Sequence, residues 1–547
     1  MKRLPALALA ACLAACGGGG GGGGESPSGG GGGGGTPIPP GNPGPSDVQF
    51  AINSGLQVHT ISRFIYGKNG NDWAAMPWLT LDRSGGNRMT AYNWENNASN
   101  AGTDWLNQND AYMGSSNVAG DSMKNRVAAV HTAGAGLIMT VPMCGYVAAD
   151  KNPPGDVNLT PNYLQVRFRQ CVAKKGSPFA YPPDTTDAYV YQDEFVSWLD
   201  GQFPYAKTDA ARTLFYCLDN EPDLWSGTHP RIHPNPVGYD ELRQKSIAYA
   251  TAIKDVVPEA VVLGPVNYGW QGYIDLQGAP DAGANGDFIE YYLAAMKAAD
   301  VAAGKRLVDV LDLHWYPEAT GGGVRITDDS AAAAVAAARV QAPRSLWDPT
   351  YTETSWITQW STGGPIRLIP RMKDKISAKY PGTKLAFTEY YYGGGGDISG
   401  AIAQADVLGI FGSEDVFAAT LWHLGSTSDA FINGGFRMFR NYDGASGAFG
   451  NTSVAASTTN AANTSVYASV DAGSPNRLVV IAINKTGVAV SAGISVTHTA
   501  LFTKAEVYQL TSVSSTPVKL ADLPITAINA FVYVMPANSV TTLVLKP

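Results

Sequence analysis

The sequence predicts an α/β fold, a TIM-like (β/α)8 barrel followed by a C-terminal antiparallel β-sandwich domain. The barrel is predicted because eight short apolar runs recur between residues 61 and 430, and several are followed by helix-like stretches. Unbroken apolar runs are typical of parallel strands covered on both faces. The sandwich is predicted because residues 431–547 carry short β-branched runs separated by Thr, Ser, Gly and Asn.

The same runs give the expected elements. The barrel strands are expected at 63–66, 88–92, 136–141, 213–218, 260–266, 307–313, 384–388 and 418–421, and helices at 121–133, 193–201, 239–257 and 288–303. Sandwich strands are expected at 477–483, 505–509, 530–535 and 539–545, and residues 47–60 are expected to join the sandwich as an extended segment. A doubly wound sheet is the alternative to the barrel, but no Gly-x-Gly-x-x-Gly motif follows the first strand.

The composition narrows the classes of partner. The 547 residues carry a net charge of −8, so no basic face is available for nucleic acid. The 12 Trp, 26 Tyr and 17 Phe on a chain with 15% charged residues suit neutral, ring-shaped ligands. We expect a monomer that needs no cofactor.

The amino terminus resembles an export signal. Residues 1–16 have a positive start, an apolar stretch and Leu13-Ala14-Ala15-Cys16, which resembles a bacterial lipobox with Cys16 as the lipidated residue. Cys12 fits the same pattern with a shorter apolar stretch, and an ordinary secretory signal is the other alternative. Residues 17–46 are almost all Gly, Pro and Ser and are expected to form a disordered tether with a reach of about 30 Å. We therefore expect an exported protein, held at the outer membrane or cell surface only through a lipid anchor.

Two glutamates follow apolar strands at the same end of the predicted barrel. Glu221 follows the fourth run in the segment 218–222 (LDNEP), and Glu389 follows the seventh in 387–389 (FTE). Pro222 is expected to keep Glu221 extended. Burying an unpaired carboxylate is costly, so two of them at matching strand ends indicate a shared site. Either one alone could instead be a structural carboxylate that pairs with Arg or caps a helix.

Paired carboxylates are what glycoside hydrolysis needs, because one protonates the leaving oxygen while the other stabilises or attacks the anomeric carbon. Aromatic rings nearby would pack on the C–H faces of sugars, although each could instead be a core residue. The candidate platforms are Trp94, Trp315, Tyr391 and Trp422. On the sixth strand, Asp312 and His314 share a face. His314 is expected to orient a carboxylate or a sugar hydroxyl, with a structural Asp–His pair as the alternative.

Four segments resemble glycoside hydrolase family 44, which contains endo-β-1,4-glucanases and xyloglucanases with a TIM-like barrel and a β-sandwich. They are residues 219–225 (DNEPDLW), with the Thr228-His229 and His233-Pro234 pairs that follow, 83–94 (RSGGNRMTAYNW), 311–318 (LDLHWYPE) and 388–394 (TEYYYGG), and the resemblance extends over residues 58–547. It implies that Glu221 is the acid/base, Glu389 the nucleophile and Asn220 a ligand of the sugar 2-hydroxyl. Tyr316 and Tyr390, in the same motifs, are expected substrate contacts. Tyr391 departs from the family pattern, which has Asn there.

The expected function is retaining, endo-acting hydrolysis of β-1,4-glucan backbones such as cellulose-like glucan or xyloglucan. Hydrolysis of another β-1,4 polysaccharide, xylan or mannan, is the first alternative. A surface lipoprotein that binds glycan without cutting it is the second, but such a protein has no need of two buried carboxylates. Family members can carry structural calcium, and no Asp-rich loop in the sequence indicates where it would bind.

Three further groups of residues have the chemistry of a site. His229 and His233 have a zinc-like spacing, but the proline after each disfavours a regular helix, so no metal site is predicted. Glu353 is a rival nucleophile that lacks a preceding strand. Cys144 and Cys171 could form a disulfide in an oxidising compartment, and Cys217 is expected to be a buried thiol.

Overall fold

The computed structural model describes residues 36–425 and 428–547. The predicted signal, with Cys16 and Cys12, and most of the predicted tether lie outside the described residues. Within the described part of the chain, no helix has both the length and the apolar character needed to cross a membrane.

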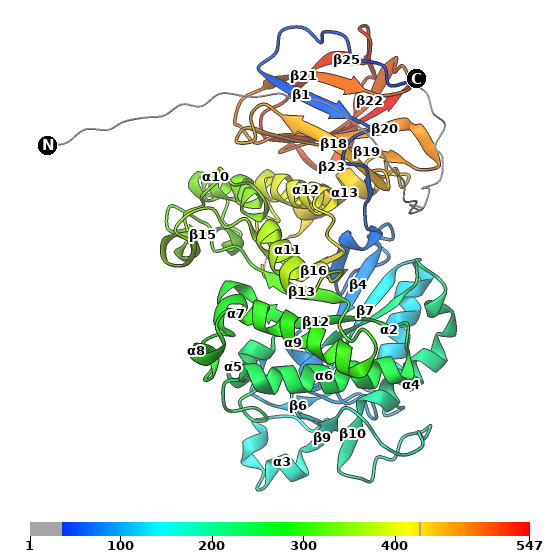
Figure 1. Cartoon of the computed structure of the whole chain (residues 1–547), viewed down its shortest axis with the longest axis vertical. Coiled ribbons are helices and arrows are strands. Elements are labelled where there is room, and N and C mark those ends of the chain that lie inside the picture. Colours follow the sequence, from blue (N-terminus) through cyan, green and yellow to red (C-terminus); the bar gives the residue numbers. More distant parts are fainter. Residues whose placement is uncertain (1–35, 426–427) are drawn as a thin grey trace, which may run out of the picture. The chain divides into compact units, whose positions relative to one another are not determined.

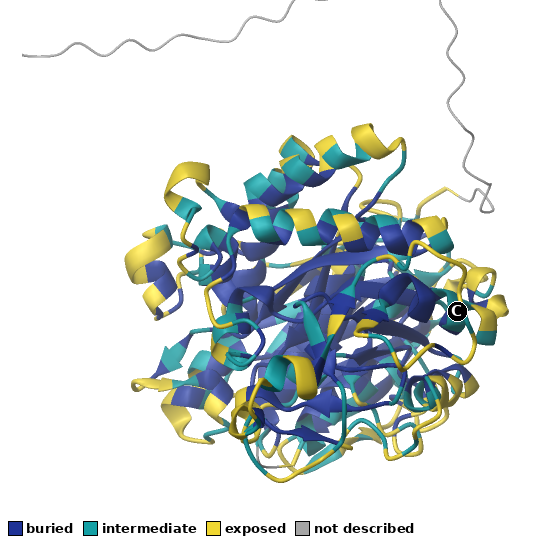
Figure 2. Cartoon of the chain, turned by 90° about the horizontal axis from the view of Figure 1, so that it is seen from below, coloured by how far each residue is buried: buried dark blue, intermediate teal, exposed yellow. Residues whose placement is uncertain are grey.

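Eight parallel strands close into a barrel with helices around it, which confirms the predicted fold class (Figure 1). Seen from below, the strands form a buried centre and the surrounding helices expose their outer faces (Figure 2). In chain order the barrel strands are β3 (Gly67–Asn69), β4 (Leu81–Ser84), β7 (Gly136–Val141), β11 (Leu214–Leu218), β12 (Val261–Tyr268), β13 (Val310–Trp315), β16 (Lys384–Tyr390) and β17 (Ala418–Leu421).

The first two barrel strands differ from the prediction. The apolar run expected as a strand at 63–66 contains a 3₁₀-helix, Arg63–Ile65, and the one at 88–92 contains α1 (Asn87–Thr90). The strands themselves, β3 and β4, are short and polar, with the sequences GKN and LDRS. Their polar side chains are buried and paired, as Lys68 with Asp429 and Arg83 with Glu389 show, so they do not give an apolar pattern.

The longer helices surround the barrel, and most bury one face against it. They are α2 (Asp121–Thr132), α4 (Gln192–Gln202), α6 (Tyr239–Val256), α9 (Phe288–Ala303), α11 (Leu368–Lys379), α12 (Ile398–Ser413) and α13 (Ala430–Arg440). Helix α13 instead packs on α12 and on the sandwich. In α9 the Asp287 side chain accepts a hydrogen bond from the Glu290 N–H, and Gly304, with φ of 65°, ends the helix. Helix α12 is a second exception, because it is buried on all sides between α13 and the sandwich strands β19 (Thr464–Asp471) and β26 (Ser539–Lys546).

Several loops at the carboxyl ends of the strands carry additional elements. After β4 come α1, β5 (Ser99–Asn100) and β6 (Asn109–Asp110). The loop after β7 contains a three-stranded sheet of β8 (Tyr146–Ala148), β9 (Phe168–Val172) and β10 (Tyr189–Tyr191), together with α3 (Tyr163–Val166). Further short elements are α5 (Trp225–Thr228), α7 (Gly269–Asp275), α8 (Ala282–Asn285), β14 (Thr320–Gly321), β15 (Val324–Arg325) and α10 (Ala333–Gln341).

The second domain is a sandwich with its own apolar core. Its strand order is β23-β22-β26-β20-β19-β18-β1-β21-β25, and β2 (His59–Thr60) and β24 (Leu523–Pro524) pair at its margins. The remaining bounds are β1 (Val48–Asn53), β18 (Thr452–Thr458), β20 (Ser474–Asn484), β21 (Val490–Thr497), β22 (Lys504–Thr511), β23 (Ser514–Lys519) and β25 (Ala530–Met535). β1, from the segment expected at 47–60, lies antiparallel to β18 and parallel to β21. Helix α13 occupies the start of the segment assigned to the sandwich, which begins with β18.

Candidate active site

Glu221 stands in a tight turn directly after β11. The backbone of Glu221 is left-handed, with φ of 43°, so the extended conformation expected from Pro222 is wrong. Hydrogen bonds overcome the local preference: the Glu221 N–H donates to the Val266 carbonyl at 3.0 Å. The Asp219 carboxylate accepts from Thr90 Oγ1 at 2.6 Å and from the Met143 N–H at 2.5 Å. Strained backbone held by such bonds is common at functional sites.

Glu389 lies on β16, and both of its carboxylate oxygens are held. Oε1 accepts a hydrogen bond from Arg83 Nη1 at 2.7 Å, and Oε2 accepts one from the Tyr316 hydroxyl at 2.6 Å. Burial raises the pKa of Tyr316 well above its ordinary value, so this phenol is a donor. Charge-assisted bonds of this kind fix a carboxylate in one orientation.

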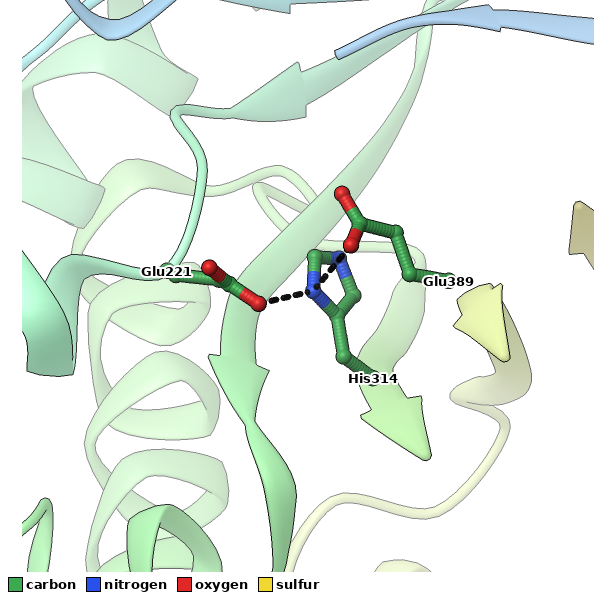
Figure 3. A group of neighbouring side chains, drawn as sticks. All are labelled: Glu221, His314 and Glu389. Atoms are coloured by element: carbon green, nitrogen blue, oxygen red, sulfur yellow. Dashed lines mark hydrogen bonds and ion pairs between the residues drawn. The ribbon is translucent and has the colours of Figure 1, made fainter. Parts of the chain in front are cut away.

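His314, on β13, lies between the two glutamates (Figure 3). Its Nδ1 is 2.8 Å from Glu221 Oε1 and 3.4 Å from Glu389 Oε2. One donor atom from each of the three residues lies within 4.8 Å of the others, and all three residues are buried. The two predicted carboxylates therefore meet at one place.

The two carboxyl groups have different surroundings. Burial raises the pKa of Glu221 to about 7; the positive charge of Arg83 opposes this shift, and the negative charge of Asp104 adds to it. Burial lowers the pKa of His314 to about 3, so its imidazole is neutral at neutral pH. Glu221 is thus suited to hold a proton, whereas Glu389 accepts hydrogen bonds from a guanidinium and a phenol.

Arg83 connects the groups at the mouth of the barrel. Its Nη2 donates to Asn220 Oδ1 at 2.8 Å while its Nη1 donates to Glu389. The Gly86 N–H also donates to Asn220 Oδ1, at 3.2 Å, which leaves the Asn220 amide nitrogen near Asn87 Oδ1, 3.4 Å away. Sequence reasoning gave Arg83 no role because it placed the second strand at 88–92, after this residue.

Comparisons with known proteins show the family of this chain. A family model described as Glycoside hydrolase family 44 matches residues 98–319. Endoglucanase A of Paenibacillus lautus is 42% identical over 522 residues, which cover 92% of this chain and 73% of that protein. The chain belongs to glycoside hydrolase family 44.

Other family 44 relatives extend the match to solved structures. A Paenibacillus polymyxa xyloglucanase, solved with xyloglucan, has a TM-score of 0.87 at 40% identity and covers 91% of this chain and 99% of that chain. An endoglucanase of Clostridium thermocellum has a TM-score of 0.86 at 40% identity, with the same coverage. A beta-mannanase/endoglucanase A of Caldicellulosiruptor saccharolyticus is 40% identical over 90% of this chain, which spans only 38% of that protein. This protein is therefore a glycoside hydrolase, and the resemblance seen in its motifs is confirmed.

Three of the residues predicted to contact sugar in this family 44 enzyme are buried, and neighbouring side chains pack against them or bind them. Trp94 is 1% exposed and packs against Phe195 and Trp198 of α4. The Trp315 indole N–H donates to the Tyr392 hydroxyl, and the Tyr390 hydroxyl accepts from Gln404 of α12. Neither ring has an open face. All three are core residues, which for Trp94 and Trp315 is the alternative that the sequence leaves open.

Two other predicted aromatic residues have different surroundings. Trp422 is half-buried and lies so close to Gly86 that a Cβ there would be 2.4 Å from its Cη2. Since the Gly86 N–H binds Asn220, Trp422 is beside the site. Tyr391 is buried, and its hydroxyl donates to Asp329 at 2.6 Å, so this side chain braces a loop.

Sequence reasoning missed two aromatic residues at the margin of the site. Tyr268 is half-buried, with its ring centroid 6.1 Å from that of Tyr316. Trp105 is 59% exposed and follows Asp104, whose carboxylate accepts a hydrogen bond from Asn87 at 2.9 Å. No sequence signal separates such exposed rings from core rings, because both are single aromatic residues in loops.

The remaining candidates lie outside this cluster. His229 is buried beside Thr228, and His233 Nε2 is 2.9 Å from Glu241 Oε1. Glu353 is buried, and its carboxylate accepts a hydrogen bond from Ser345. In the described part of the chain, Cys144, Cys171 and Cys217 are buried free thiols, so the considered disulfide is absent there.

Calcium does not fit the donor cluster at the site. Within residues 36–425 and 428–547, Glu221, His314 and Glu389 are the only group of three or more His, Cys, Asp or Glu residues close enough to share an ion. Calcium takes six to eight oxygen ligands, whereas this cluster has an imidazole nitrogen and an adjacent guanidinium. We therefore assign no ion to it.

Proposed function

We propose that this family 44 enzyme hydrolyses β-1,4-glucan backbones with retention of configuration, with Glu389 as nucleophile and Glu221 as acid/base. One observation carries the proposal: the two carboxyl groups, from the fourth and seventh barrel strands, approach within 4.8 Å around His314. Retaining enzymes place these groups about 5–5.5 Å apart, whereas inverting enzymes need about 6.5–9.5 Å to admit a water.

In the first half of the proposed reaction, Glu389 attacks the anomeric carbon while Glu221 protonates the leaving oxygen. Arg83 and Tyr316 hold both oxygens of Glu389, which keeps the carboxylate oriented. The neutral His314 imidazole beside Glu221 fixes the position of the acid without adding a charge.

In the second half, the bond from Glu389 to the sugar is broken by water. Glu221 has given its proton to the leaving oxygen, and because the negative charge of Glu389 is lost when the ester forms, Glu221 stays ionised and can take a proton from the attacking water. Asn220, held by Arg83 and Gly86, is placed to bind the 2-hydroxyl of the sugar being cleaved. A hydrogen bond there strengthens in the transition state.

The substrate class rests on the relatives. The Paenibacillus lautus relative is named an endoglucanase, and the Paenibacillus polymyxa structure is titled a xyloglucanase with xyloglucan. A β-1,4-glucan chain is therefore proposed here. The Caldicellulosiruptor saccharolyticus relative is also named a mannanase, and a solved relative at 31% identity is titled a glucanase-xylanase, which keeps mannan and xylan as the alternatives.

Parallel assays test this proposal. Reducing-end release and viscosity are measured on carboxymethyl cellulose, xyloglucan, xylan and mannan, and the first-formed anomer is followed by NMR. We expect a rapid fall in viscosity on a glucan and a β-anomer first. Glu389→Gln should be almost inactive, and azide should rescue Glu221→Ala on an activated aryl glycoside. An α-anomer first, or release without any fall in viscosity, would contradict the proposal.

We also propose that Cys16 carries a lipid and that the protein acts as a monomer at the cell surface or outer membrane. The sequence pattern at residues 1–16 supports the anchor. Ile38 pairs with His498, and the Gly41 N–H donates to Ile528, so the chain from Cys16 enters the described residues at the sandwich. Metabolic palmitate labelling should mark the wild type and Cys12→Ser but not Cys16→Ser. Equal labelling of all three would refute the assignment, and size-exclusion light scattering tests the monomer.

A further inference from the structure

The side chains of β16 do not alternate regularly near Glu389. Phe387 and Tyr390 are three residues apart, so a regular strand would point them to opposite faces. Both rings nevertheless contact Phe411 of α12, each with a centroid distance of 5.4 Å. An extra residue must lie between them.

The pairing with the neighbouring strands identifies that residue as Thr388. Against β13, Leu313 pairs with Phe387 and the next residue, His314, pairs with Glu389. Against β17, the register also shifts between Phe387 and Tyr390. Thr388 is therefore the extra residue of a β-bulge.

The bulge decides which way Glu389 points. A one-residue change in register moves a side chain to the other face of a strand. Without the bulge, Glu389 would be on the face that Phe387 presents to α12. With it, Glu389 lies beside Arg83 and His314 inside the mouth of the barrel.

A buried aspartate on the adjacent strand binds the bulge. Asp312 Oδ1 accepts from the Thr388 N–H at 3.3 Å, and Asp312 Oδ2 accepts from Thr388 Oγ1 at 2.9 Å. The Thr388 carbonyl accepts from Asn69 Nδ2 at 3.0 Å and from Thr420 Oγ1. Asp312 is fully buried and makes no hydrogen bond with its side chain other than these two among the described residues.

We propose that Asp312 is a positioning residue: its carboxylate holds the β-bulge at Thr388, and the bulge aims Glu389 at the substrate. This inference rests on the proposed role of Glu389 as nucleophile. The competing explanation is that Asp312 only balances the charge of Arg83, to which it makes no hydrogen bond. The two explanations predict different results for a substitution of Thr388. Such a substitution removes a bond between Asp312 and the bulge but leaves the charge of Asp312 in place.

The test compares Thr388→Val, Thr388→Ser and Asp312→Asn. The valine side chain keeps the shape of threonine but cannot donate to Asp312, so only the backbone N–H bond remains; serine keeps the hydroxyl, and asparagine offers one acceptor where Thr388 needs two. Thr140→Val is the matched control, because Thr140 is an equally buried barrel threonine whose hydroxyl donates to the Ser84 carbonyl. Folding is checked by circular dichroism.

For Thr388→Val and Asp312→Asn we expect kcat to fall about 100-fold with little change in KM, the size of effect that a misplaced reacting group produces. The loss should be equal on polymer and on an activated aryl β-cellobioside, because the acid is spared. Thr388→Ser and Thr140→Val should stay near wild type. Full activity of Thr388→Val, or a loss confined to Asp312→Asn, would overturn the inference. If Glu389→Gln remained active, the proposed function would fail instead.

Discussion

At the residue scale, the raised pKa of Glu221 predicts the alkaline limit of activity. Glu221 acts as an acid only while protonated, and burial raises its pKa to about 7. We therefore expect kcat/KM to fall as the pH rises through about 7. The negative charge of Asp104 contributes to the raised pKa, so Asp104→Asn should move this limit to lower pH.

Asp415→Asn is the control for that pH profile. Asp415 is an exposed aspartate just before β17, at the other end of the barrel strands. Its replacement should leave the limit in place. A limit that moves upward in Asp104→Asn, or moves equally in both variants, would contradict the assignment of Glu221 as the acid.

The sequence predicts the carboxylates and the imidazole of the site much better than its aromatic residues. Glu221, Glu389 and His314 could be found because carboxylates and imidazoles at the ends of apolar strands require a function. Trp94 and Trp422 could not be told apart, since the same ring serves as core packing in one and stands half-exposed beside Gly86 in the other. Only the neighbours in space decide which ring face is open.

At the element scale, the apolar sequence pattern does not predict the barrel strands that have buried polar side chains at the site. The six later strands are apolar and were located from their runs, whereas β3 and β4 read as loops. Arg83 of β4 can be fully buried because its two terminal nitrogens donate to Glu389 and Asn220. Strands at functional sites often break the apolar sequence pattern. Their buried polar residues are stabilised by partners that are distant in the sequence, so no local pattern reveals them.

The loop after β4 gives a prediction of its own. Gly86 has φ of 81°, and a Cβ there would lie 2.4 Å from Trp422. Gly86→Ala should displace the Trp422 ring and lower kcat/KM on polymer at least about tenfold, as expected for small displacements at a site. Gly70→Ala is the control, because Gly70 has φ of 69° but nothing within 4 Å of the added Cβ.

The paired variants separate backbone strain from the loss of Trp422. Both replacements place an alanine at positive φ, a strain of about 1–3 kcal/mol, and Gly86, with ψ of 172°, lies in a region that essentially only glycine adopts. Thermal unfolding should therefore show destabilisation in both proteins, larger in Gly86→Ala because its Cβ also meets Trp422, with the activity loss confined to Gly86→Ala. Equal kinetics in both would show that Trp422 does not contribute to substrate binding.

At the scale of the whole molecule, a buried ion pair joins the barrel to the sandwich. Asp406 of α12 lies 2.7 Å from Lys485, which follows β20, and both side chains are 1% exposed. The Tyr467 hydroxyl of β19 donates to the other carboxylate oxygen at 2.6 Å. Sandwich strands also cover the face of α12 that a barrel helix ordinarily exposes to water. This helix is therefore buried on all sides.

Removing one partner of this pair leaves a charge buried without compensation. Asp406→Asn or Lys485→Met alone should lower the free energy of unfolding by about 3–5 kcal/mol, and the double variant should lose much less than the sum. The exposed pair Lys504–Asp522 is the control, where the same cycle should give at most about 1 kcal/mol. Urea unfolding measures both cycles. Additive losses at Asp406 and Lys485 would mean that the two domains are held together by their apolar contacts and not by this pair.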